Sequence, residues 1–342
     1  MYAVENNAAE RTAPPLGASG LFQDVLKNLQ GGSPWPCWLF VGPHGSGDVQ
    51  MLQALASALL HTDQVVDWET LELESDKADF VQPASDLFCT TAPSVACARA
   101  LISFLRTMPL DNNRFRIALL VGLDRATKAA QNILLKTLEE PPPRTLFFAS
   151  AGTQVGVLPT LRSRMQVRSL RPLSKAQFAQ MMPEFLARNG AVLPKDLTMD
   201  GLFQATCGLS GLALDFCEEG GQLPLYQALK RGMLPPDHPA FYSLFMPDSK
   251  KLWEGQGPDV VWRLFSLMIQ GILIRFAQKT ATPEEQAIAG RLSVYSWGGF
   301  LNAARQQFQD IQTYNLGLLG GVTFLLSLGG RSIAGKRSIA SA

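Results

Sequence analysis

The hydrophobic pattern of this 342-residue chain changes character about halfway along its length. In the first half, short continuous apolar runs alternate with stretches in which apolar residues recur every three or four positions. Such runs are typical of buried strands, and the recurring pattern is typical of amphipathic helices. Strands are predicted at 38–41, 117–121 and 146–149, and helices at 21–29, 51–59, 94–108 and 126–139. Short strands alternating with helices indicate a parallel sheet with helices on both faces.

From residue 169 onward the pattern is helical. A helix is predicted at 173–189, with a break at Pro183, because proline removes a backbone donor and clashes with the preceding turn. Between Val261 and Phe276 apolar residues recur at helical spacing without a miss, which predicts a long helix of a bundle. Further helices are predicted at 197–206, 208–217, 293–311 and 315–328.

These changes of pattern divide the chain into five segments. We predict, in order, a flexible leader (1–17), an α/β domain (18–171), a small helical domain (172–219), a helical bundle (220–332) and a disordered tail (333–342). A chain of 342 residues is too long for one ordinary core, which agrees with several domains. The predicted fold class is therefore α/β plus all-α.

Charge is unevenly distributed although the formal net charge is only +1. The stretch from Asp63 to Asp86 holds eight acids and one lysine, whereas the stretch from Arg99 to Arg168 holds eleven bases and four acids. Two interpretations remain open for this segregation. The two stretches are either solvated faces of opposite sign, or they include a surface that meets phosphate or an acidic partner.

The five cysteines and the apolar runs favour a cytoplasmic protein without membrane contact. No two cysteines have C-x-x-C spacing, which argues against a zinc knuckle or a redox dithiol and indicates reduced thiols. The polar N-terminus lacks the apolar core of a signal peptide. The longest apolar run, Leu316 to Leu328, contains three glycines and is short for a bilayer span, so we interpret it as a buried helix.

A glycine-rich loop follows the first predicted strand. Its sequence GPHGSGDV fits the phosphate-binding pattern G-x-x-x-x-G-K-[ST] except at the last two positions, which are Asp48 and Val49. Losing the lysine removes roughly 1.5 to 3 kcal/mol of phosphate binding, and a carboxylate about 4 Å from a phosphate oxygen adds repulsion of order 4 kcal/mol. We therefore expect Gly42, Gly45 and Gly47 to serve only the strand-to-helix turn, with no ATP and no magnesium bound.

The end of the second predicted strand also departs from a nucleotide hydrolase. Such enzymes end this strand with an Asp-Glu pair, one acid for the magnesium shell and one to polarise water. Here Val121 and Gly122 stand at the end of the strand, and the first acid is Asp124. We interpret Asp124 and Arg125 as a helix-start pair rather than as part of a metal site.

The stretch from Gln131 to Arg164 contains the remaining candidate site. It begins as a helix, which ends with Glu139 and Glu140 before a triple proline that cannot continue it. A buried strand and a glycine-containing loop follow, and the stretch ends in Ser163 and Arg164. A strand that feeds such a loop presents a cation at the edge of a domain.

The motifs LLKTLEEPP at 134–142 and LPTLRSR at 158–164 resemble the clamp-loader branch of AAA+ proteins, most closely the delta-prime subunits of bacterial DNA polymerase III. The resemblance covers about residues 21–173 by motif and the rest by layout. It implies an AAA+ (P-loop NTPase-like) sheet domain, a helical lid and a helical collar, in a ring that places the sliding clamp on primed DNA. By this resemblance Arg164 is an arginine finger for the ATP site of the adjacent motor subunit, and Ser163 belongs to the same motif.

The sequence also departs from this family. Only the ungrouped Cys89 and Cys97 stand where the family carries a four-cysteine zinc module, so we expect no zinc. Ala151 occupies the position of the polar sensor-one residue, and Leu212 occupies the position of a sensor arginine in motor subunits. Met165 replaces the cysteine of the family's S-R-C motif, a cysteine with no obvious role in the chemistry.

The leading interpretation is a non-hydrolysing subunit of the DNA polymerase III clamp loader. The implied partners are gamma/tau-like motor subunits, a delta-like subunit, the sliding clamp through the complex, and primed DNA through sequence-independent phosphate contacts. One alternative is a structural AAA+ scaffold in which Arg164 only forms an interface ion pair. A less favoured alternative is an active AAA+ ATPase with an unusual phosphate loop. Arg162 is a nearby alternative cation outside the motif.

Overall fold

A computed structural model describes residues 14–29, 35–60, 81–84, 86–91, 93–106, 115–218, 220–234, 258–291 and 294–314. These residues belong to two compact units, one drawn from 1–190 and 208–214 and the other from 191–207 and 215–342. The predicted leader up to residue 13, most of the acidic stretch, the helix at 315–328 and the tail lie outside the described residues. The division into leader, sheet domain, lid, collar and tail stays a prediction.

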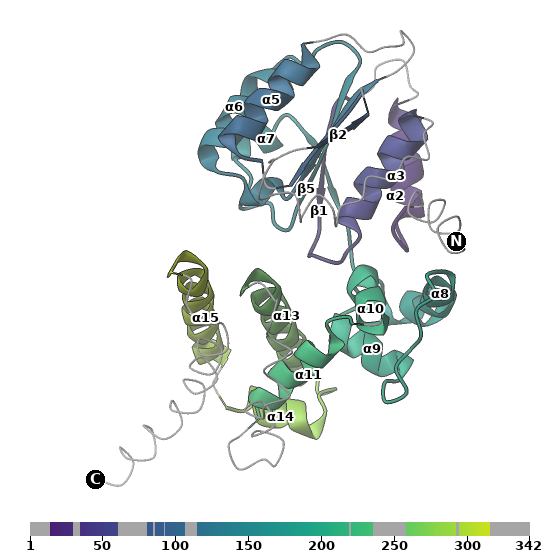
Figure 1. The fold of residues 1–342 in the computed structure, drawn as a ribbon. Helices are drawn as coiled ribbons and strands as arrows, with labels where there is room; N and C mark the ends of the chain where they lie inside the picture. Colours follow the sequence, from purple (N-terminus) through teal and green to yellow (C-terminus); the bar gives the residue numbers. More distant parts are fainter. Residues whose placement is uncertain are drawn as a thin grey trace. The chain divides into compact units, whose positions relative to one another are not determined.

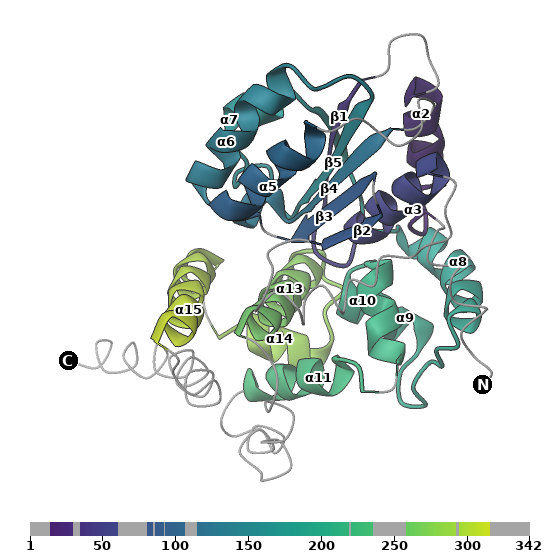
Figure 2. The ribbon, with the colours of Figure 1, turned by 45° about the horizontal axis from the view of Figure 1, so that its top comes forward.

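The first unit is built on a six-stranded sheet in the order β2-β3-β4-β5-β1-β6. Its strands are β1 (Cys37–Val41), β2 (Val81–Ala84), β3 (Leu87–Thr91), β4 (Arg116–Val121), β5 (Thr145–Ala151) and β6 (Gln166–Ser169). Every neighbouring pair is parallel except β2 with β3, which is antiparallel. The predicted parallel sheet is therefore confirmed, with β1 between β5 and β6. Figure 2 shows β1, β5, β4, β3 and β2 side by side in this order.

Helices cover both faces of this sheet (Figure 1). On one face lie α2 (Ser19–Leu29) and α3 (Asp48–Leu60), and on the other lie α5 (Val95–Leu105), α6 (Lys128–Glu139) and α7 (Pro159–Arg162). Alternate residues of β1 point to opposite faces, so Trp38 and Phe40 join the core under α3 whereas Leu39 joins the core under α6. Both layers of core therefore receive side chains from β1.

The sequence analysis missed three strands, β2, β3 and β6. β2 and β6 lie at the two edges of the sheet, and β6 reads QVRS with half-buried and exposed residues, so it lacks an apolar run. β3 is buried but only five residues long, and it follows directly on the acidic stretch. Short strands of this kind give little periodic signal.

The predicted break at Pro183 is wrong. Helix α8 (Lys175–Arg188) runs through this proline without interruption. Its apolar side chains Phe178, Met182 and Leu186 are spaced four apart and are all buried, so packing on both sides of Pro183 keeps the helix together. A capping box at Ser174 fixes the first turn, because the Ser174 hydroxyl accepts a hydrogen bond from the backbone N–H of Gln177.

The second unit is helical. It contains α9 (Met199–Thr206), α11 (Leu223–Gly232), α13 (Pro258–Ala277), α14 (Pro283–Ala289) and α15 (Val294–Tyr314), while α10 (Ser210–Cys217) contributes to both units. The long helix predicted from Val261 is confirmed as α13, with one correction at its end. Phe276 is 43% exposed, because the buried position of the last turn is taken by Arg275.

Arg275 forms a buried ion pair within this helical unit. Its Nε and Nη2 atoms donate to the two carboxylate oxygens of Glu285 at 3.1 and 2.7 Å, and its Nη1 donates to the carbonyl of Gln204. Glu285 also accepts from the N–H of Thr282, the N-cap of α14. The pair therefore joins α9, α13 and α14 through one guanidinium.

One described helix passes a simple test for a membrane span. Residues Val260–Ala277 of α13 are long and apolar enough by length and composition, and about 44% of this window is buried inside the protein. A core helix of a soluble protein passes the same test, so this finding is weak support for a span.

Candidate functional site

The glycine loop after β1 forms the turn that its sequence predicts. Gly45 and Gly47 have φ of +85° and +84°, in the left-handed region that L side chains rarely adopt. A Cβ added to Gly42 would lie 2.4 Å from Ser46 Oγ and 2.8 Å from the carbonyl oxygen of Leu170, so this position also requires glycine. The buried Ser46 hydroxyl has no hydrogen-bond partner among the described residues.

Other parts of the same unit lie against this loop. A Cβ on Gly47 would come within 2.4 Å of Pro15, which precedes α2. The carbonyl of Gly45 accepts a hydrogen bond from the N–H of Gly211 at 3.0 Å, and a Cβ on Gly45 would lie 3.2 Å from the backbone nitrogen of Leu212. The segment before α2 and the start of α10 thus approach the loop at its two left-handed glycines.

Asp48, which stands in place of the phosphate-binding lysine, is held by the end of β5. Its carboxylate accepts a hydrogen bond from the Ser150 hydroxyl and lies near the charge of Arg125. Burial raises the pKa of Asp48 above its usual range, and the contacts with Ser150 and Arg125 oppose this rise. The Ser150 oxygen in turn accepts from the N–H of Gly122 at 3.2 Å. One polar network therefore joins the loop to the ends of β4 and β5.

At the end of β4 the chain presents a guanidinium and no acidic pair. Gly122 has φ of +67°, and a Cβ there would lie 2.5 Å from the Nε and Nη2 atoms of Arg125. Asp124 accepts a hydrogen bond from the N–H of Thr153 at 3.3 Å. The predicted helix-start pair is partly wrong, because Asp124 and Arg125 lie in a separate 3-10 turn and the N-cap of α6 is Thr127. Among the described residues, no group of three or more His, Cys, Asp or Glu side chains could hold a metal ion.

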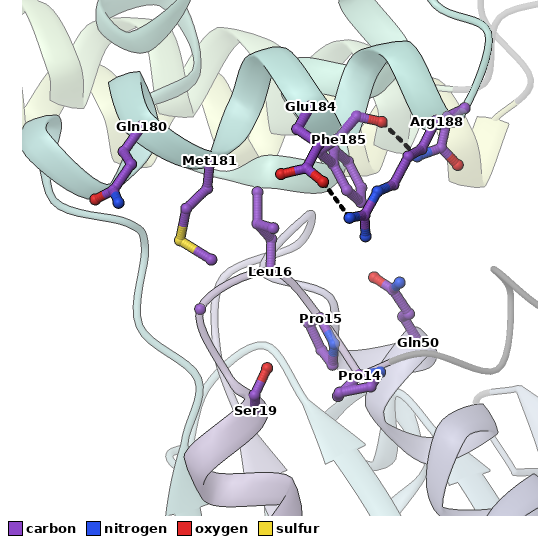
Figure 3. Close-up of a pocket in the computed structure, with 12 residues that line it drawn as sticks. Pro14, Pro15, Leu16, Ser19, Gln50, Gln180, Met181, Glu184, Phe185 and Arg188 are labelled. Atoms are coloured by element: carbon purple, nitrogen blue, oxygen red, sulfur yellow. Dashed lines mark hydrogen bonds and ion pairs between the residues drawn. The ribbon is translucent and has the colours of Figure 1, made fainter.

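A cavity of about 470 Å³ lies beside the loop (Figure 3). Its walls come from the segment before α2, from Gln50 of α3 and from one face of α8. Pro15 belongs both to this wall and to the contact with Gly47, so it stands between the cavity and the loop. The charged lining residues Glu184 and Arg188 pair with each other, as the dashed line in Figure 3 shows. The other lining side chains are apolar, amide or, at Ser19, hydroxyl.

The predicted cation, Arg164, lies just after α7 on a firmly anchored segment. Ser163 ends α7 and donates its hydroxyl to the Thr160 carbonyl at 3.0 Å. Met165 is only 5% exposed and packs in the core under α6. The residues on either side of Arg164 are therefore held in place, and the Arg164 side chain remains 32% exposed.

The Arg164 guanidinium has three hydrogen-bond partners. Its Nη1 atom donates to the Thr160 carbonyl at 2.6 Å and to the Ser163 hydroxyl at 3.3 Å. Its Nη2 atom donates to the carboxylate of Glu139, in the last turn of α6. The alternative cation Arg162 differs, because its Nη1 atom reaches only Gln154 at 3.5 Å and its buried Nε has no partner among the described residues.

A buried glutamine on α6 fixes the other end of the same segment. Gln131 is 1% exposed, and its Nε2 lies 3.2, 3.1 and 3.0 Å from the carbonyl oxygens of Leu123, Ala126 and Gly156. Its Oε1 accepts a hydrogen bond from the N–H of Leu158 at 2.8 Å. The loop that leads into α7 is thus bound to α6 at Gln131, and Arg164, two residues after α7, is bound to α6 at Glu139.

A hydrogen bond joins Arg164 to its neighbour Ser163, and none of their hydrogen bonds among the described residues involves the Asp48 network. Sequence reasoning missed the roles of Ser150, Gln131 and Glu139. Gln131 did carry a signal, because it lies on the same helical face as the buried Leu134 and Leu138, and a polar residue in an apolar stripe needs a buried partner. The partner of Glu139 lies 25 residues away, and no local pattern reveals it.

The fold and the loop together define a class of protein. A mostly parallel sheet, a turn with two left-handed glycines after β1, a following helix and a helical C-terminal region make up the AAA+, P-loop NTPase-like architecture.

Comparisons with known proteins narrow this class. The family model described as "DNA polymerase III, delta subunit" matches residues 18–174. The DNA polymerase III subunit delta' of Haemophilus influenzae is 35% identical over 111 residues, which span 32% of each chain. The Replication factor C small subunit of Picrophilus torridus is 25% identical over 185 residues, 54% of this chain and 53% of that protein. Over its N-terminal region the chain is thus similar to subunits of DNA polymerase III and of replication factor C.

The sequence matches cover only part of each relative's length. The matched regions span about a third of the Haemophilus protein and about half of the Picrophilus protein. A solved structure of a DNA polymerase III gamma subunit-related protein from Thermotoga maritima is 15% identical, with a TM-score of 0.46 and coverage of 92% of this chain and 98% of that chain. The activities and partners of whole relatives therefore apply to this chain only as proposals.

Proposed function

We propose that this chain is a clamp-loader subunit of DNA polymerase III that hydrolyses no ATP and supplies Arg164 in trans to the ATP site of a neighbouring motor subunit. The single observation that carries the proposal is a contrast within one unit. The chain's own loop holds a carboxylate that belongs to an internal network, while an anchored guanidinium elsewhere is partly exposed. A finger that acts in trans needs no phosphate site in its own chain.

The glycine loop supports the non-hydrolysing half of this proposal. Asp48 would face a nucleotide phosphate with like charge, and two charges about 4 Å apart repel by roughly 4 kcal/mol at an effective dielectric near 20. Pro15 and Leu212 lie against the two glycines whose backbone would approach a phosphate. The groups present therefore do not fit a triphosphate with magnesium, and the proposed function assigns no reaction to this loop.

The geometry of Arg164 supports the trans-acting half. An arginine finger stabilises charge that develops on the transferring phosphoryl group, so it must be held rigidly and remain accessible. Three hydrogen bonds hold the guanidinium, and the Nε proton and one Nη2 proton have no acceptor among the described residues. The neighbouring subunit would supply the nucleotide, the metal and the attacking water.

The test is ATP hydrolysis by a loader assembled with its cognate motor subunits. Replacing Arg164→Ala should lower DNA-stimulated turnover at the adjacent site by about 10³-fold or more, since such fingers contribute 10³ to 10⁵. Arg164→Lys should restore little, because the planar fork is lost. Arg162→Ala serves as the matched control and should leave turnover unchanged. A fully assembled ring with unaltered ATPase in the Arg164→Ala variant would show the finger assignment to be wrong.

A structural scaffold is the second candidate, and the ion pair between Arg164 and Glu139 is the observation that favours it. In that case the Arg164→Ala variant would weaken assembly of the ring, and the surviving complex would keep its turnover per site. Sedimentation of the assembled loader separates the two candidates. Tight binding of ATP by the isolated chain would contradict both and would favour an active ATPase.

The remaining parts of the proposal concern location and partners. We infer that the chain acts in the cytoplasm with gamma/tau-like and delta-like subunits. The complex would meet the sliding clamp and primed DNA, and any DNA contact of this chain would be to phosphate and independent of sequence. Co-purification with a motor subunit whose phosphate loop retains its lysine is the direct test.

A further inference from the structure

Residues 156–164, here called the Arg164 segment, contain α7. Helix α6 contacts this segment on both sides of α7. Gln131 lies near the start of this helix and binds Gly156 and Leu158, whereas Glu139 is its last residue and binds Arg164. The buried Gln131 fixes the backbone of the segment. The Glu139 carboxylate, with 45% of its side chain exposed, contacts only the guanidinium among the described residues.

The three partners of the guanidinium differ in what they fix. The Thr160 carbonyl and the Ser163 hydroxyl both belong to the α7 segment, so they hold Nη1 close to its own backbone. Glu139 comes from a different element and holds Nη2. A planar guanidinium held at both terminal nitrogens has little freedom to rotate about its long flexible stem.

We propose that Glu139 is a positioning residue that orients the Arg164 guanidinium for its action in trans. This inference rests on the proposed function, because it matters only if Arg164 reaches a neighbour's phosphate. Glu139 touches neither substrate nor reacting atoms and acts through Arg164. The same contact explains why a carboxylate stands at the end of α6, just before the proline run.

The exposure of the pair sets the size of the effect. An ion pair with partly exposed side chains is worth little in stability, so removing it should leave folding intact. Orientation acts on the transition state, so its loss should lower kcat about two- to fivefold and leave KM for ATP unchanged. If Glu139 only stabilised the fold, its replacement would not lower kcat while leaving KM for ATP unchanged.

The experiment compares Glu139 with its neighbour Glu140 in the assembled loader. Glu139→Ala should give the two- to fivefold fall in kcat. Glu139→Gln should recover most of it, because an amide oxygen still accepts a hydrogen bond from Nη2. Glu140→Ala makes the same change of charge one residue away and should match the unmodified loader. The double variant with Arg164→Ala should be no slower than Arg164→Ala alone, since the two residues act as a unit.

The outcomes separate this inference from the proposed function. If Arg164→Ala lowers turnover but Glu139→Ala and Glu140→Ala both behave as the unmodified loader, Glu139 does not position the finger. A rise in turnover in Glu139→Ala would also overturn the inference, because Glu139 would then restrain Arg164. Failure of the proposed function has a different signature, in which Arg164→Ala itself leaves turnover unchanged.

Discussion

Replacing the buried Gln131 with methionine tests how the Arg164 segment is held. Methionine has a similar length and an unbranched side chain, so it can fill the same space without a hydrogen-bonding amide. The substitution removes the donors to the carbonyls of Leu123, Ala126 and Gly156 and the acceptor for the N–H of Leu158. It changes no residue of α7 and leaves Arg164 in place.

The magnitude follows from the number of bonds that Gln131 can make at once. Its amide has two hydrogens, so it satisfies two of the three nearby carbonyls at a time, and its oxygen accepts one further bond. With each bond worth about 0.5 to 1.5 kcal/mol net, the loss is roughly 1.5 to 4.5 kcal/mol. For a unit of this size, about 1 kcal/mol lowers the melting temperature by roughly 2 to 4 °C.

Two measurements follow the change in the isolated chain. Thermal unfolding gives the loss of global stability in the sheet-containing unit. Amide hydrogen exchange gives the local effect, because the N–H of Leu158 loses its acceptor and should exchange much faster, while amides in β4 and β5 should lose only the protection due to global stability.

The exposed neighbour Asn132 supplies the control. Asn132→Met adds the same side chain on the same turn of α6 and should change neither the melting temperature nor the exchange at Leu158. If Gln131→Met leaves both quantities as they are, the glutamine does not carry the segment, and the reasoning that joins α6 to Arg164 through it is refuted.

Two further predictions concern the pH dependence of stability. Burial raises the pKa of Asp48, so the folded state binds this proton more tightly than the unfolded state, and stability falls as pH rises above about 4. Asp48→Asn should therefore be more stable than the unmodified chain between pH 4.5 and 7, as measured by urea unfolding. A gain in stability that shrinks with rising pH would contradict this. Burial alone would raise the pKa of Glu285, but its contacts with Arg275 lower this pKa overall. The ion pair therefore contributes to stability above about pH 4.5, and the contribution is lost as pH falls. Glu285→Gln should lower the free energy of unfolding by about 3 kcal/mol at pH 7 and by less near pH 4, and a pH-independent loss would exclude the ion pair as its cause.

Periodic patterns predicted much of the fold. The apolar stripe of α13 and the alternation of short strands with α3, α5 and α6 are local properties, and the structure confirms them. β3 and β6 were missed because neighbouring strands stabilise them, and a strand's own residues need not show this. Pro183 misled the analysis for a related reason, since buried side chains on both sides of it keep α8 continuous.

The candidate site was predictable only where a motif marked it. Arg164 and the departure at Asp48 are visible in the sequence because each stands at a defined place in a known pattern. Their partners, Glu139 and Ser150, come from other helices and strands. Which of these elements become neighbours in space depends on the order of the strands in the sheet. A contact between side chains that are far apart in sequence needs the fold before it can be read.

The contacts around the glycine loop also bear on how such a chain could change over evolutionary time. Placing a lysine at position 48 would break the hydrogen bond to Ser150 and bring a second cation close to Arg125. Pro15 would still lie against Gly47, and an acidic side chain at Gly122 would collide with the Arg125 guanidinium in a backbone conformation that favours glycine. If the loop binds no nucleotide, as proposed, no single substitution would make it bind phosphate, and intermediates with only one of these changes would be less stable proteins.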